Sequence, residues 1–398
     1  MGPKKTISDK KIVDKDQTKV SEKINLHSYL HDHAAKTPPR TTPSKGSAKD
    51  TRLVSLALQG GGSHGAYTWG VLDRLLEEEN LEIEGISGTS AGAMNAAVMV
   101  DGYIKNGRPG AKEGLRNFWS EVSRMGQYSP MHNSPFPGTP NNWNLDSSPA
   151  FVMFDIFTRL FSPYQINPMN INPLKNIVEN LIDFDALQKS NMIDLFVTAT
   201  SVTTGQPHVF HHKEITIDTI MGSACLPSMF QAVKIGDDHY WDGGYAGNPS
   251  IWPLTYHSDT SDIVVVEINP VKRETLPMNG NDVANRVNEI AFNASLISEI
   301  RSIHLINTLI EKKHVSTDRY RKLHIHLVEA PDSMLELNAS SKVNTSWEFL
   351  EHLKELGRKS AEKWLKLNFE HLGVKSSVDI YDTYLKHRKH PFIEVRRD

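Results

Sequence analysis

The sequence has very little of what a secreted disulfide scaffold or a membrane-spanning protein requires. Its 398 residues include a single cysteine, Cys225, so no disulfide can form within the chain. No run approaches the roughly 18 uninterrupted apolar residues of a transmembrane helix. The N-terminal lysines are not followed by the apolar core of a signal peptide. These absences predict a cytoplasmic protein. Export without a cleaved signal peptide remains an alternative.

The chain as a whole also has no large excess of positive or negative charge. The formal net charge is −3, with 44 basic and 47 acidic side chains, so we expect no nucleic-acid partner. Residues 1–50 are an exception, because they carry 11 basic and 6 acidic residues and few large apolar ones. Such a segment cannot bury enough apolar surface to offset its ordering entropy. We interpret it as a disordered basic arm, either a solvated tail or an attachment to an anionic membrane or a partner.

The remainder alternates apolar strand-like runs with amphipathic helices. Residues 53–58, 195–202 and 262–269 form near-continuous apolar runs, as buried parallel strands do. After the first run, apolar residues recur at helical spacing over about 64–79. This alternation predicts a three-layer α/β/α fold, in which helices cover both faces of a mostly parallel sheet.

Changes in composition suggest the limits of one folded domain over residues 51–372, with its core at 52–270. Residues 126–175 are rich in Pro, Asn and aromatic residues, so we expect either a cap inserted over one end of the sheet or apolar side chains that complete the core. Residues 282–372 contain two long amphipathic helices, and 373–398 read as a polar tail.

A glycine-rich loop is the first of three stretches that could carry chemistry. Gly60, Gly61 and Gly62, followed by Ser63, His64 and Gly65, fit the pattern Gly-x-Gly-x-x-Gly between a strand and a helix. In that context the pattern is typical of a dinucleotide pyrophosphate site. Bare backbone N–H groups also stabilise a transition-state oxyanion. The loop by itself is compatible with both.

The second stretch is a Gly-x-Ser-x-Gly pentapeptide formed by Gly88, Ser90 and Gly92 and the residues between them. It follows a strand and opens a helix rich in small residues, which is the context of a nucleophile elbow. If its strand and the first strand are parallel neighbours, the glycine-loop amides face the region above Ser90.

The third stretch supplies a candidate base. Asp242 precedes Gly243 and Gly244 after an aromatic run. Asp before two glycines is also a common turn signal, but a serine nucleophile needs a base. A Ser-His-Asp triad is the competing interpretation, because the chain has 18 histidines. The candidates for its histidine are His64, His239 and the cluster of His208, His211 and His212.

In this order, the three stretches resemble the motifs of the patatin-like phospholipase family over roughly residues 52–270. The resemblance implies a Ser90–Asp242 dyad, an oxyanion hole made by the amides of the glycine loop, and no cofactor or metal. The supporting motif residues would be His64, Gly65, Gly88, Gly92, Gly243 and Gly244. The family often has Arg or Lys where this chain has His64.

The resemblance implies a lipid acyl hydrolase of the phospholipase A or lysophospholipase type. Its partners would be a phospholipid or other acyl lipid, with peripheral membrane contact, and a protein activator is left open. The alternatives are hydrolysis of another ester (a neutral lipid or an intracellular polyester), a dinucleotide-binding oxidoreductase, and a catalytically silent lipid-binding regulator.

Overall fold

A computed structural model describes residues 51–127, 143–146, 148–316 and 320–386. The predictions for the basic arm, for the first part of the insertion and for the last twelve residues therefore lie outside the described residues.

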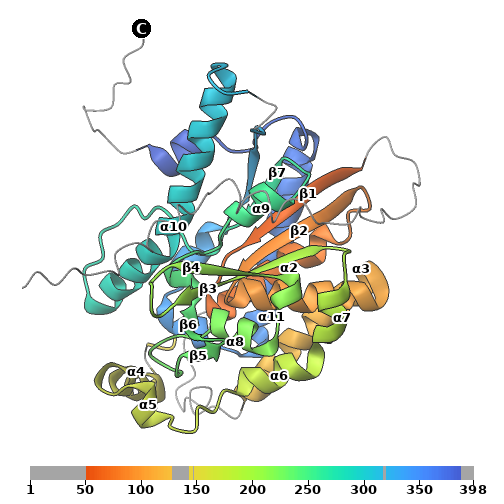
Figure 1. Cartoon of the computed structure of the whole chain (residues 1–398). Coiled ribbons are helices and arrows are strands. Elements are labelled where there is room, and N and C mark those ends of the chain that lie inside the picture. Colours follow the sequence, from red (N-terminus) through yellow and green to blue (C-terminus); the bar gives the residue numbers. More distant parts are fainter. Residues whose placement is uncertain (1–50, 128–142, 147, 317–319, 387–398) are drawn as a thin grey trace, which may run out of the picture. The chain divides into compact units, whose positions relative to one another are not determined.

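A mixed sheet of eight strands forms the centre of the fold (Figure 1). Five parallel strands, in the order β3-β2-β1-β7-β8, make up most of it. They are β1 (Arg52–Leu58), β2 (Leu81–Thr89), β3 (Asp194–Ser201), β7 (Asp262–Val266) and β8 (His324–Val328). Three shorter strands extend it in antiparallel pairs beside β3: β4 (Pro207–His211), β5 (Val233–Ile235) and β6 (Asp238–Asp242). The predicted mostly parallel α/β sheet is confirmed.

Side chains on the two faces of the sheet enter two separate apolar cores. Leu56 and Leu58 of β1 point into the larger core, whereas Ala57 between them points into the smaller one. Because successive residues of a strand face opposite sides, continuous apolar runs are what this layered arrangement requires. The three-layer prediction is confirmed.

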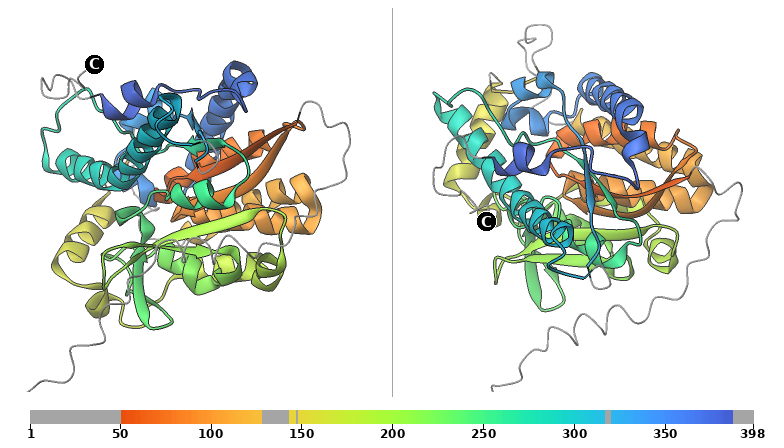
Figure 2. Two further views of the ribbon diagram at one scale, coloured as in Figure 1. Left: turned by 45° about the horizontal axis from the view of Figure 1, so that its top comes forward. Right: turned by 90° about the horizontal axis from the view of Figure 1, so that it is seen from above.

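The larger core is covered by α2 (Gly65–Leu75), α3 (Ala91–Gly126) and α11 (Trp347–Asn368). The smaller core is covered by α9 (Trp252–His257) and α10 (Gly280–Glu311), on the opposite face of the sheet (Figure 2). The remaining α-helices of the described chain are α4 (Pro149–Leu160), α5 (Pro163–Ile166), α6 (Pro173–Leu181), α7 (Phe184–Lys189) and α8 (Ile217–Ser223). None of the helices in the described ranges is long and apolar enough to cross a bilayer.

The described part of the insertion is a surface structure. None of the residues of α4 is buried, including Phe151, Phe154, Phe157 and Leu160, which could have completed the core. Two hydrogen bonds connect its described part to other segments. The Leu145 amide donates to Ser340 Oγ at 2.8 Å, and Gln231 Nε2 donates to the Asn167 carbonyl at 2.9 Å.

The segment after residue 372 differs from the expected polar tail. The side chains of Ile380 and Tyr384 are buried in the smaller core. The Ser377 amide donates to the Ile325 carbonyl at 3.2 Å, which holds the segment against β8. Val378 and Leu385 pack against the same core, so the prediction of a polar tail overlooked short apolar stretches between charged residues.

Helices α2 and α11 approach each other so closely that the contact requires glycine. A Cβ on Gly357 would lie 2.0 Å from the Tyr67 carbonyl oxygen, and one on Gly70 would lie 1.9 Å from the Lys354 carbonyl oxygen. Neither oxygen can move without displacing a helix backbone. The pairing of α11 with α2 therefore depends on these two positions.

We expect Gly357→Ala to lower the free energy of unfolding by about 2 kcal/mol or more, because overpacking outweighs the better helix propensity of alanine. Gly280→Ala is the matched control, since no atom lies within 4 Å of an added Cβ there. It should change stability by less than about 0.5 kcal/mol. Urea denaturation of both variants measures the difference, and equal small effects would contradict the close contact.

Candidate active site

Ser90 lies where the two central strands end. Strands β1 and β2 are parallel neighbours, with Leu58 paired to Gly88, so their following loops leave the same edge of the sheet. Ser90 has φ 55° and ψ −122° and precedes the first turn of α3. A positive φ strains a residue with a side chain and persists only where surrounding contacts enforce it. This is the conformation expected of a nucleophile elbow.

Glycines allow the backbones around Ser90 to touch. A Cβ on Gly92 would lie 2.3 Å from the Leu58 carbonyl oxygen, and one on Gly60 would lie 2.6 Å from Ser90 Cβ. Gly65 and Gly88 pack just as closely on the start of α3. The glycines of both motifs therefore bring the loop after β1 against the turn after β2.

Ser223 of α8 holds the turn from the other side. Its hydroxyl accepts a hydrogen bond from the Ser90 amide at 2.9 Å and donates one to the Thr198 carbonyl at 2.6 Å. Sequence reasoning did not single out Ser223, because a lone serine in a short helix carries no distinctive signal.

Asp242 reaches the same edge from the end of β6, paired antiparallel with Ala199 of β3. Asp242 is 1% exposed, its carboxylate accepts a hydrogen bond from the Gly244 amide at 2.7 Å, and the Ser90 side chain is close enough to lower its pKa. A Cβ on Gly243 would lie 2.1 Å from the Thr198 carbonyl oxygen, so this turn also needs glycine. The structure thus brings together Ser90 and Asp242, 152 positions apart in the sequence.

Burial dominates the electrostatics of Asp242. Removal from water raises the pKa of its carboxyl to about 6, although the Gly244 hydrogen bond, the Ser90 side chain and the positive charge of Lys342 oppose the rise. Near neutral pH the group is therefore ionised and still basic enough to accept a proton from a hydroxyl in a transition state.

The glycine loop offers fewer free donors than the sequence suggests. The Gly60 amide donates to Asn248 Oδ1 at 2.6 Å, so it is already engaged. Within the described residues, the amides of Gly61 and Gly62 have no hydrogen-bond acceptor. The set of three expected oxyanion donors is accordingly reduced to these two.

A buried cluster of side-chain amides holds this loop in place. Gln59 Oε1 accepts from the Ile268 and Asn269 amides, each at 2.9 Å, and its Nε2 donates to Asn293 Oδ1 at 2.9 Å. Asn269 Nδ2 in turn donates to the Gly60 carbonyl at 2.7 Å. The cluster is closed by Asn248, and all of its side chains are almost fully buried. Of these residues, Gln59 and Asn269 stand at the ends of predicted apolar strands, and Asn248 and Asn293 left no sequence signal.

The histidine candidates do not contact Ser90 in the described chain. His64 is buried and its Nε2 lies 2.8 Å from Ser341 Oγ. Burial, helped by the nearby Lys342, lowers the pKa of His64 to about 3, so its ring is neutral. His239 is exposed, and His208 packs against the rings of Phe210 and Tyr240.

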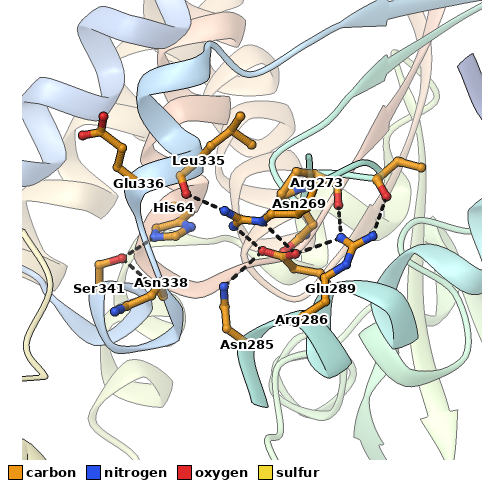
Figure 3. Close-up of polar contacts among 12 residues, drawn as sticks. His64, Asn269, Arg273, Asn285, Arg286, Glu289, Leu335, Glu336, Asn338 and Ser341 are labelled. Atoms are coloured by element: carbon orange, nitrogen blue, oxygen red, sulfur yellow. Dashed lines mark hydrogen bonds and ion pairs between the residues drawn. The ribbon is translucent and has the colours of Figure 1, made fainter. Parts of the chain in front are cut away.

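Residues from the C-terminal third complete the surroundings of the loop. Lys342 lies in the short 3₁₀ helix η5 (Ala339–Val343), where its carbonyl oxygen would be 2.4 Å from a Cβ on Gly62. Nearby, Glu289 of α10 is bound by both Arg273 and Arg286, as Figure 3 shows. The figure also shows His64 beside Ser341.

One cluster in the described chain could hold a metal, but it is remote from Ser90. Ligand atoms of Asp194, His211 and His212 lie within 4.8 Å of one another. Asp194 pairs with Gly85 at the start of the β2–β3 ladder, whereas Ser90 follows its end. No metal ligand is therefore contributed to the Ser90 edge by this cluster.

The raised pKa of Asp242 has a consequence for stability. An ordinary Asp ionises near 3.8, so the unfolded chain loses this proton before the folded one does. The stabilising contribution is therefore greatest below pH 3.8 and is lost as the pH rises through about 6. At pH 8 we expect the free energy of unfolding of Asp242→Asn to exceed that of the wild type by roughly 3 kcal/mol. At pH 4 the two values should differ little. Urea titrations at the two pH values measure this.

Asp238 provides a control of opposite sign. Hydrogen bonds from Ser201 and Thr203 lower the pKa of this partly exposed carboxyl. Asp238→Asn should therefore lose stability relative to the wild type above the ordinary carboxyl pKa. A pH-independent effect of Asp242→Asn would contradict the buried, ionisable carboxylate.

A family model and several solved structures resemble this chain. No curated protein matches the chain. Among solved structures, VipD from Legionella pneumophila is 14% identical with a TM-score of 0.39, covering 85% of this chain and 73% of VipD. ExoU in the ExoU–SpcU complex from Pseudomonas aeruginosa is 17% identical with a TM-score of 0.32, covering 81% of this chain and 52% of ExoU. The family model "Patatin-like phospholipase" matches residues 56–255. The chain belongs to the patatin-like phospholipase family.

Proposed function

We propose that this lipid hydrolase cleaves carboxylic esters of phospholipids, as a phospholipase A or lysophospholipase, with Ser90 as nucleophile and Asp242 as its base. The observation that supports the proposal most strongly is the buried Asp242 carboxylate, whose pKa responds to the nearby side chain of a serine in a strained turn. The two unpaired amides of Gly61 and Gly62 lie in the adjoining loop, which packs on Ser90 through Gly60.

The proposed reaction uses one proton acceptor twice. Asp242 takes the proton of Ser90 as its Oγ attacks the ester carbonyl, and the amides of Gly61 and Gly62 bind the resulting oxyanion. Collapse of this intermediate breaks the ester C–O bond, and Asp242 returns the proton to the leaving alcohol. Water then attacks the acyl-enzyme with the same assistance, releasing the fatty acid and restoring Ser90.

The pH dependence of the reaction should report Asp242. We expect kcat/KM for p-nitrophenyl butyrate to rise about tenfold per pH unit below pH 6 and to level off above it, because only the ionised carboxylate accepts the proton. Ser90→Ala and Asp242→Asn should each reduce kcat/KM by about a thousandfold or more. A fluorophosphonate should label the wild type and not Ser90→Ala.

His239→Ala is the matched control for a triad, because His239 is exposed. It should retain esterase activity, and His64→Gln should retain acyl-enzyme formation. If either abolished acyl-enzyme formation as completely as Ser90→Ala, the dyad would be excluded. A panel of phospholipids, neutral lipids and polyesters separates the remaining substrate classes. A wild type inactive on all of them would favour the silent regulator.

We further propose that the insertion docks on the membrane that contains the substrate. Five apolar side chains of α4 are 44–70% exposed: Val152, Met153, Ile156, Phe157 and Leu160. Helix α4 lies beside the first turns of α10 (Figure 2), with a cavity of about 130 Å³ between them that Phe151, Val152 and Ala284 help to line. Exposed apolar surfaces of this extent mark interaction sites, and a bilayer is the surface from which a phospholipase takes its substrate.

Ile156→Asp combined with Phe157→Asp should weaken binding to phosphatidylcholine vesicles at least tenfold, because each side chain loses about 1.5 kcal/mol or more of apolar burial. Hydrolysis of p-nitrophenyl butyrate should be unchanged. Leu367→Asp, on the exposed side of α11, is the control and should not affect vesicle binding. Co-sedimentation measures binding, and equal losses in both variants would contradict docking through α4.

A further inference from the structure

We propose that Lys342 binds the phosphate of a phospholipid substrate and so makes the site favour phospholipids over uncharged esters. The inference rests on the proposed Ser90–Asp242 chemistry and names the group that would recognise the substrate's charge.

Lys342 is in contact with the loop that carries the free amides. Its carbonyl oxygen and Cβ would lie 2.4 and 3.3 Å from a Cβ on Gly62. Its Nζ donates to Asn269 Oδ1 at 3.0 Å, and Asn269 Nδ2 donates to the Gly60 carbonyl at 2.7 Å. The ammonium is therefore two hydrogen bonds away from the loop backbone.

The same ammonium also lies near the carboxylate. Lys342 Nζ is 5.6 Å from the centre of the Phe292 ring. Ring atoms of Phe292 lie 3.0 Å from the position of a Cβ on Gly244, whose amide is bound by Asp242. Lys342 thus contacts both the glycine loop and the aromatic residue that packs beside Asp242.

The positive charge of Lys342 has no direct counter-ion within the described residues. None of their carboxylates is within 4.0 Å of its Nζ, and Asn269 Oδ1 is its one hydrogen-bond acceptor. Burial lowers the pKa of Lys342, while the charges of Glu289 and Asp242 raise it. An ammonium that is partly removed from water without a paired anion is costly, and a bound anion would remove that cost.

The Glu289 carboxylate, whose charge acts on Lys342, does not provide this anion. Glu289 is held by Arg273 at 2.6 Å and by Arg286 at 3.0 Å, so two guanidinium groups share its charge (Figure 3). Together with Lys342, these groups carry a net positive charge beside the site. In a glycerophospholipid the phosphate is linked to the same glycerol as the scissile ester. An ester carbonyl on the loop amides therefore brings the phosphate close to the loop's neighbours.

Lys342 could instead stabilise the oxyanion of the transition state. Substrates with and without a phosphate distinguish this role from phosphate binding. Phosphatidylcholine and diacylglycerol carry the same acyl esters with and without a phosphate. In mixed micelles, Lys342→Met should lower kcat/KM for phosphatidylcholine about tenfold or more, mainly through KM. Loss of the Lys342 charge also raises the pKa of Asp242, which affects every ester alike. The ratio of kcat/KM for phosphatidylcholine to that for diacylglycerol should therefore fall about tenfold, because only phosphatidylcholine carries a phosphate for Lys342 to bind.

Lys342→Arg should restore most of the activity on phosphatidylcholine, since a guanidinium also binds phosphate. Lys366→Met, an exposed lysine of α11, is the matched control and should leave both lipid activities unchanged. Equal losses on phosphatidylcholine and diacylglycerol would show that Lys342 acts on acyl transfer itself and would overturn the proposal. Unchanged activity on both would overturn it as well.

Two further measurements distinguish a failure of the Lys342 proposal from a failure of the proposed Ser90–Asp242 chemistry. Hydrolysis of p-nitrophenyl butyrate by the wild type and by Ser90→Ala shows whether the serine chemistry exists. If Lys342→Met does not fold, calorimetric binding of sn-glycerol 3-phosphate to the wild type, Lys342→Arg and Lys342→Gln replaces it. Binding that is lost only in Lys342→Gln supports the phosphate site, and absent or equal binding in all three overturns it.

Discussion

The site depends on the contact between two backbone segments where β1 and β2 end. Parallel pairing brings both loops to one edge, and the glycines at 60 and 92 let them meet at distances that no side chain permits. That contact holds Ser90 at a positive φ and places the loop amides next to it. The antiparallel pairing of β6 with β3 then brings Asp242 to the same edge from a distant part of the chain.

Burial gives this edge its chemical character. Removal from water raises the pKa of Asp242 and lowers that of His64, so one group becomes a stronger base and the other is kept neutral. The exclusion of water also makes an amide without a hydrogen-bond partner costly. This explains why the Asn269 side chain donates hydrogen bonds to Gln59 and to the Gly60 backbone. The loop is consequently held rigid before any substrate arrives, as electrostatic stabilisation of an oxyanion requires.

The strands and the three motifs could be predicted because each has a local signature. Continuous apolar runs predict the parallel strands, and glycines around a serine or after an aspartate predict tight turns. Ser223, Asn248 and Lys342 have no such signature, since each acts through a contact between distant segments. For the same reason, the sequence could not show that the Gly60 amide is already bound to a side chain. The short strands β4 and β5 were missed because they are narrow extensions of the sheet with few buried residues.

The packing of η5 on the glycine loop also shows that the active site extends beyond the segment matched by the family model. The family match ends at residue 255, yet Gly62 packs on Lys342 and the loop is braced by Asn269. A polypeptide shortened to the matched region would retain every recognisable motif and lose the groups that shape the loop. A motif search would find all three motifs in such a shortened chain. The chain could still not form the active site, because residues outside the matched region hold the glycine loop in its conformation.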